Sequence, residues 1–164
     1  MANTKKIITE YTGAEDMETA VKEAREAVNV LDLLLGSDIG EIKLPTKQVE
    51  ITRLTELYGK PFVITCKALS PEKFEEVQDM AVNIKGKDAD LDLNLLQIFV
   101  TIEGIVDEAG KPMLKNKDLM AKFNAKTPKE LARKLFLSGE IANIYNEISE
   151  LSGYGDASVT EVKN

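Results

Sequence analysis

Apolar residues along this chain change from a spacing of two to a spacing of three and four, and this change limits the folds that it can adopt. On both sides of the turn-forming sequence Y-G-K-P at 58–61, apolar positions alternate with mostly polar ones. The alternating apolar positions are Val49, Ile51, Phe62, Ile64, Cys66 and Ala68. Alternation is typical of a strand with one buried face, so we predict an antiparallel β-hairpin over residues 48–68. After Ser70 the spacing becomes helical.

The residues after this hairpin contain clear signals for helix starts. Ser70 and Thr127 each precede a proline, and Glu130 follows Thr127 by three residues. This order places a capping side chain before a proline at the first helical position, and Glu130 completes a capping box. Asn116 is expected to cap a further short helix. Together with the apolar spacing, these signals predict helices over 71–85, 93–107, 128–136 and 139–152.

The segment Asp88–Asn94 has aspartates at alternate positions, as the start of a calcium-binding loop does. The sixth position of such a loop should be glycine and is Leu93, and the twelfth should be glutamate and is Phe99. The calcium motif therefore fails twice. We interpret the aspartates as favourable charges at the start of a helix, where the helix dipole attracts negative charge.

The helix expected over 93–107 is the most apolar part of the chain. A helix that is apolar over most of its surface belongs in a core, so we predict that stability is concentrated around Phe99 and Ile102. The alternation of Leu91, Leu93 and Leu95 leaves the first turn of this helix open between helix and strand.

A second amphipathic stretch precedes the hairpin. Thr12 and Glu15 form another capping-box pattern, and apolar residues three and four apart follow, so we predict a helix over 14–35 that ends at Gly36. Such a stripe usually forms core. It also precedes a connector and lies outside the hairpin and its helices, which favours a docking surface for a client helix. The residues expected to make that contact are Val21, Val28, Leu31 and Leu35.

These elements predict a mainly helical α+β domain with one antiparallel β-hairpin, preceded by an N-terminal amphipathic helix. Apart from that helix, the chain divides into a flexible lead at 1–13, the α+β domain at 36–155 and a frayed tail at 156–164. The tail is expected to fray because it has little apolar surface to bury.

Composition narrows the classes of function. Of the 164 residues, 43% are apolar and 30% charged, as in ordinary globular proteins. The net charge of −7 argues against nucleic-acid binding, since contacts with phosphates need clustered Lys and Arg. No apolar run approaches the roughly 20 residues that span a bilayer, and the N-terminus has no secretory signal. We therefore expect cytosolic synthesis, with neither nucleic acid nor membrane as a partner.

Histidine is absent, and Cys66 is the one cysteine. The commonest metal ligand and proton shuttle at neutral pH is therefore missing, and Cys66 lacks the usual activating base. Its place in the alternating run favours a small core residue. We predict no catalytic site, no metal and no cofactor. A hydrolase that uses unpaired carboxylates is an alternative, but no glycine-rich or basic phosphate cradle accompanies those carboxylates.

Several short segments resemble a known family through their order and spacing. They read L-P-T-K-Q-V-E-I-T-R-L at 44–54, G-K-P-F-V-I-T-C-K-A-L-S at 59–70, L-K-N-K-D-L at 114–119, T-P-K-E-L at 127–131, G-E-I-A-N-I-Y-N-E-I-S-E-L-S-G-Y-G at 139–155 and E-V-K-N at 161–164. In this order they resemble the XkdN-like phage tail assembly chaperones. The resemblance covers about residues 31–164, and the predicted helix at 14–30 lies outside it.

The resemblance implies a protein without enzymatic activity that works in the cytoplasm of a host bacterium. It implies binding to the tape-measure protein during tail assembly, with tail-tube subunits as a second candidate partner and self-association left open. The alternative is a structural subunit that stays in the mature phage tail or tail-like particle. Purified particles separate the two, because a chaperone is absent from them and a subunit is present in many copies.

Overall fold

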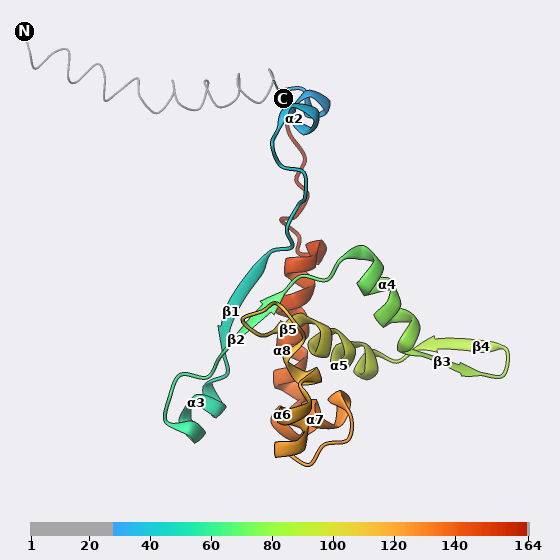
Figure 1. The fold of residues 1–164 in the computed structure, drawn as a ribbon. Helices are drawn as coiled ribbons and strands as arrows, with labels where there is room; N and C mark the ends of the chain where they lie inside the picture. Colours follow the sequence, from blue (N-terminus) through green and yellow to red (C-terminus); the bar gives the residue numbers. More distant parts are fainter. Residues whose placement is uncertain (1–27, 164) are drawn as a thin grey trace, which may run out of the picture. The chain divides into compact units, whose positions relative to one another are not determined.

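The computed structural model describes residues 28–163 and divides the chain into two units, Met1–Ile42 and Lys43–Asn164 (Figure 1). In the first unit the described residues contain helix α2, Val30–Gly36. Asn29 caps this helix, because its side-chain oxygen accepts hydrogen bonds from the backbone N–H groups of Leu31 and Asp32 at 2.9 and 3.3 Å. The prediction of one helix over 14–35 is wrong at Val28 and Asn29, which are not helical, since Asn29 is extended and α2 begins at Val30. Residues 14–27 of the predicted helix lie outside the described residues.

The second unit begins with a three-stranded antiparallel sheet in the order β1-β2-β5. Its strands are β1 (Thr46–Glu50), β2 (Val63–Lys67) and β5 (Ile105–Val106). The antiparallel pairing predicted from the alternating residues is confirmed for β1 and β2, where Val49 lies opposite Ile64. The prediction of a simple hairpin over 48–68 is wrong, because helix α3 (Thr52–Tyr58) separates the two strands.

The sequence around α3 explains this correction. Leu54 is buried in the core, and Gly59 ends the helix in the left-handed region, with φ at 69° and its N–H bonded to Thr55 O. The Thr55 hydroxyl accepts a hydrogen bond from the N–H of Phe62 at 2.8 Å, which returns the chain to the sheet. The alternating run before the turn is only four residues long, too short to exclude a helix after it.

Helix α4 (Pro71–Met80) also ends earlier than predicted. The prediction of a helix over 71–85 is wrong for its last residues. There, strand β3 (Val82–Lys85) pairs with β4 (Asp88–Leu91) in a two-stranded sheet. Gly86 explains the difference: its φ of 66° permits a two-residue turn, which closes a hairpin rather than ending a helix.

The aspartates of the failed calcium motif lie in different elements. Asp88 and Asp90 belong to β4, so the interpretation that they begin a helix is wrong. Asp92 does cap helix α5, since its carboxylate accepts a hydrogen bond from Leu95 N–H at 3.1 Å. The strand alternative for the residues before α5 is correct as far as Leu91.

The remaining helices complete the second unit. They are α5 (Leu93–Gly104), η1 (Met113–Lys115), α6 (Lys117–Lys122), α7 (Pro128–Leu135), α8 (Ser138–Ser149) and the π-helical turn η2 (Glu150–Tyr154). The helix predicted over 93–107 is too long, because the chain leaves α5 after Gly104 to form β5. The predicted caps are confirmed at Ser70, Asn116 and Thr127, whose side-chain oxygens accept hydrogen bonds from backbone N–H groups three residues later.

The core lies where α5 packs against α8, α7 and α4 (Figure 1). Gly104 lets α5 and α8 approach closely: a Cβ built on Gly104 would lie 2.8 and 2.9 Å from Cγ1 and Cγ2 of Ile148, and closer still to Cδ1. Ile102 and Cys66 are buried as predicted, whereas Phe99 is only partly buried. The predicted core helix is confirmed, but its centre lies at Val100 and Ile102 rather than at Phe99.

Candidate protein-binding surfaces

Helix α2 presents apolar side chains to solvent. They are between 59% and 77% exposed, and none of the helix residues is buried. These side chains belong to Val30, Leu31, Leu33, Leu34 and Leu35. Of the predicted contact residues, Val28, Leu31 and Leu35 are therefore exposed, while Val21 lies outside the described residues.

The helical spacing gathers part of this apolar surface on one face. Leu31, Leu34 and Leu35 are separated by three and four residues, so their side chains lie next to one another along α2. Asp32 is the one charged residue of the helix. A short helix that is apolar nearly all round is marginal in water and is normally covered by another surface. We call Leu31, Leu34 and Leu35 the α2 face.

A groove with an apolar floor opens on the second unit between α4, α5 and the start of α7. Its volume is about 290 Å³. The apolar lining residues are Val77, Met80, Phe99, Ile102 and Pro128. The charged ones are Glu103, Lys115 and Lys129, and Lys115 forms an ion pair with Glu103. We call this hollow the α4–α5–α7 groove; its presence explains why Phe99, which lines it, is only partly buried.

A wider hollow of about 720 Å³ lies where α4 begins, beside the end of α8. The rings of Phe74 and Tyr154, which line it, are 5.0 Å apart between their centroids. Phe74 is buried while Tyr154 is 64% exposed, and the residues of η2 form one side of this hollow.

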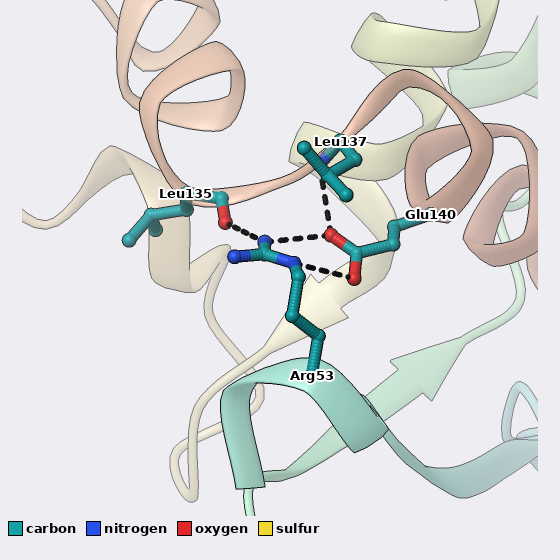
Figure 2. Close-up of polar contacts among 4 residues, drawn as sticks. All are labelled: Arg53, Leu135, Leu137 and Glu140. Carbon is teal, nitrogen blue, oxygen red and sulfur yellow. Dashed lines mark hydrogen bonds and ion pairs between the residues drawn. The ribbon is translucent and has the colours of Figure 1, made fainter. Parts of the chain in front are cut away.

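Arg53 and Glu140 form the most connected polar cluster of the described residues (Figure 2). Both oxygens of Glu140 accept from the guanidinium, at 2.8 and 3.0 Å, and Arg53 also donates to the carbonyl of Leu135 at 2.9 Å. The N–H of Leu137 donates to the same carboxylate at 2.8 Å. The cluster ties α3 to the junction between α7 and α8.

The chemistry of this cluster is that of a structural clamp. Hydrogen bonding from Arg53 holds the pKa of the Glu140 carboxyl below its usual range, because it stabilises the charged form. Both carboxylate oxygens are occupied by the protein itself, so Glu140 has little capacity left to move a proton or to bind a ligand. Sequence reasoning missed the pair, since its members are 87 residues apart.

Cys66 is fully buried in β2, and burial raises the pKa of its thiol to about 11. A thiol with so high a pKa is protonated at neutral pH and is a poor nucleophile. Among residues 28–163, no three side chains of the metal-binding types lie close enough to hold an ion. Nor does that part of the chain contain a helix with the length and apolar character needed to cross a membrane.

Comparisons with known proteins give a similar fold and a family. The crystal structure of the protein YqbN is similar in fold, with a TM-score of 0.51 and 22% sequence identity, over 73% of this chain and 93% of that one. Proteins with curated descriptions gave no match. A family model described as phage XkdN-like tail assembly chaperone protein matches residues 31–164. That match covers α2 from Leu31 onward and all of the second unit, and the chain therefore belongs to the family of XkdN-like phage tail assembly chaperones.

Proposed function

We propose that this tail assembly chaperone binds the tape-measure protein of its phage in the cytoplasm of the host bacterium, through the apolar surface of the α2 segment. The observation that carries the proposal is the exposure of Leu31 and Leu35, at 62% and 77%, on a helix with no buried residue. Contiguous exposed apolar surface is typical of a protein-interaction site. Val21 and Val28 are proposed to extend the same contact.

The energetics of α2 support a binding role. Covering a leucine side chain that is otherwise exposed contributes about 1.5–3 kcal/mol to the free energy of binding. A client that covers the α2 face gains this contribution from each of its three leucines. The net charge of −7 on the whole chain keeps a protein with such a surface soluble through mutual repulsion. A chaperone for a long client needs both properties: an apolar surface for the client and a charged body that does not aggregate.

Co-expression of the chain with its cognate tape-measure protein tests the proposal. The expected result is co-purification and a soluble client. The double variant Leu31→Glu and Leu35→Glu should lose the client while its thermal transition stays unchanged. A matched control is Leu57→Glu with Leu93→Glu, which places the same charges on two other exposed leucines. The proposal is wrong if the wild-type chain leaves the client insoluble, or if both double variants retain it equally.

A structural subunit retained in the mature tail is the second candidate, because the exposed α2 face would serve a permanent contact as well as a transient one. Mass spectrometry of purified particles separates the two. A chaperone should be absent from the particles, whereas a subunit should be present in many copies.

A further inference from the structure

Strand β1 forms one edge of the three-stranded sheet (Figure 1). We propose that this edge binds an extended, basic segment of a partner protein, which adds to the sheet as a further strand beside β1. The Lys or Arg side chains of that segment enter an acidic hollow between β1 and α8. This inference goes beyond the proposed function, because it concerns a different surface and a partner segment of different chemistry.

The hydrogen bonds at the two ends of β1 show which of its backbone groups face outwards. The carbonyl of Pro45 accepts from the N–H of Ala68 at 2.9 Å, and the N–H of Ile51 donates to the carbonyl of Phe62 at 3.0 Å. Residues that bond to the neighbouring strand alternate along an antiparallel strand, so the odd-numbered positions of β1 face β2. The even-numbered positions face away, and their backbone groups make no hydrogen bond within residues 28–163. These positions are Thr46, Gln48 and Glu50.

An edge with unpaired backbone groups is a template for an added strand. Proteins protect such edges with prolines, bulges or outward-pointing charges. Strand β1 contains no proline and pairs with β2 without a bulge from Thr46 to Glu50. Its one lysine, Lys47, is held by Glu147 at 2.6 Å on the side of α8. The edge of β1 therefore has none of these protections along its five residues.

A hollow of about 410 Å³ lies beside this edge. Its lining comes from the end of β1, the start of α3 and one face of α8, whereas β2 contributes no residue. The hollow is therefore on the side of β1 away from β2, next to the place that an added strand would occupy. The charged residues of its lining are Glu50, Arg53, Glu140 and Glu147. We call it the β1–α8 hollow.

The charges of the β1–α8 hollow favour a cation. Three of its four charged residues are glutamates, and Arg53 is already bonded to both oxygens of Glu140. Lys47 donates to one oxygen of Glu147, and among residues 28–163 no group donates to the other. Glu50 accepts at one oxygen from a hydroxyl of α3 at 2.9 Å, which leaves its second oxygen available within the same range. A lysine or arginine in the hollow gains two carboxylates, whereas an acidic side chain meets repulsion.

The alternation of side chains determines the pattern of the partner segment. On β1 the side chains of Lys47 and Val49 face α8, because Lys47 bonds to Glu147 and Val49 packs against the core. Every second side chain of an added strand faces the same way. The segment that fits this edge is therefore extended and has Lys or Arg at every second position.

A synthetic peptide tests the inference on the full-length chain. The probe alternates lysine with threonine over about six residues, the length of a typical strand. Fluorescence anisotropy of the labelled peptide should show saturable binding at chain concentrations up to about 1 mM, and affinity should fall as salt is added. A peptide with glutamate in place of lysine should bind about tenfold more weakly or worse. So should a lysine peptide with a central proline, which cannot complete the ladder.

Two variants separate the backbone contact from the charge contact. Gln48→Pro removes an outward N–H and no bond to β2, while Glu50→Gln with Glu147→Gln removes two charges and keeps their shape. Each should weaken binding of the lysine peptide about tenfold or more, with thermal melts to show that the variants are folded. The matched control Glu72→Gln, Glu75→Gln changes two exposed glutamates of α4 and should bind like the wild-type chain. If Gln48→Pro does not fold, the double variant still tests the charge contact.

Hydrogen exchange along β1 gives the decisive result and does not depend on any variant. With the lysine peptide bound, the amides of Thr46, Gln48 and Glu50 should exchange more slowly, while those of Lys47 and Val49, which already face β2, should change little. The inference is overturned if the lysine peptide does not bind up to about 1 mM, or if the glutamate peptide binds as tightly. It is also overturned if a folded Gln48→Pro variant binds like the wild-type chain, or if the added protection lies outside β1.

The same peptide keeps this inference separate from the proposed function. The α2 variant Leu31→Glu, Leu35→Glu should bind the lysine peptide like the wild-type chain, because its substitutions lie outside β1 and the hollow. Failure of the peptide experiments with tape-measure binding intact would overturn only the edge-strand inference. Loss of tape-measure binding with peptide binding intact would count against the proposed function alone.

Discussion

Leu31 in α2 and Leu131 in α7 are the same residue type in two short helices, yet the first is 62% exposed and the second fully buried. α7 is held by a capping threonine, by Pro128 at its first position and by the surrounding core. α2 has its capping asparagine but no buried residue. The comparison teaches that local signals form both helices, while of these two helices only α7 has buried residues within residues 28–163.

The substitution with the largest expected effect on stability tests the difference between α2 and α7 most directly. Leu131→Ala should lower the free energy of unfolding by about 2–5 kcal/mol, because it leaves a cavity in the core. Leu31→Ala should change it by about 0.5 kcal/mol or less, since the side chain is already in water. Urea denaturation of both variants measures the difference. Equal losses would mean that α2 belongs to the core.

Gly104→Ala tests the closest approach within the core and should cost about 1–3 kcal/mol, because the new Cβ meets the side chain of Ile148. The variant Ile148→Val removes one of the crowding carbons. If crowding is the cause, Gly104→Ala should be less damaging in the Ile148→Val background than in the wild-type chain, as a double-mutant cycle would show. Strictly additive losses would contradict that cause.

A substitution of Thr101, which lies in the same helix as Gly104, should change stability by a smaller amount. Its side chain is fully buried in α5 and its hydroxyl has no hydrogen-bond partner among the described residues. Thr101→Val keeps the shape and removes the unpaired hydroxyl, so stability should rise by about 1 kcal/mol. A thermal melt measures the gain, and Thr101→Ser serves as the control that keeps the hydroxyl. A loss of stability in Thr101→Val would show that the hydroxyl does have a partner.

The clamp between Arg53 and Glu140 should have the smallest effect, because the arginine side chain is 40% exposed. The pKa of Glu140 is lower in the folded chain than in the unfolded chain. Its contribution is therefore fully present above the ordinary Glu pKa of about 4.3 and is lost as the pH falls through the lowered value. Arg53→Met should flatten this acid dependence, which unfolding curves between neutral and acidic pH would measure. An unchanged acid profile would show that the clamp does not influence stability.

The sequence predicted the elements whose signals are local. Ser70, Asn116 and Thr127 specify their helix starts through side chains three residues from the groups that they cap, and all three predictions are confirmed. The strand pair β1–β2 was predictable because alternation continues for several residues in β2. The helix between these strands and the β3–β4 hairpin were missed because of Gly59 and Gly86. Each glycine is compatible both with the end of a helix and with a turn between two strands.

The parts that depend on distant residues were beyond sequence reasoning. The third strand follows α5 directly, so its two residues continue an apolar helical pattern, and only pairing with Cys66 and Thr65 makes them a strand. The partial exposure of Phe99 depends on the groove, which needs α4, α5 and α7 together. The proposed contact residues in α2 follow from the amphipathic pattern, and their role stays a prediction until a complex is measured.

Hydrogen exchange at the backbone amides of α2 tests the central claim most directly. On binding the cognate tape-measure protein, the amides of Leu33 to Leu35 should exchange much more slowly, while those at the centre of α5 should keep their already slow rates. Unchanged exchange in α2 within a formed complex would contradict the account, because the client would then be held elsewhere on the chain.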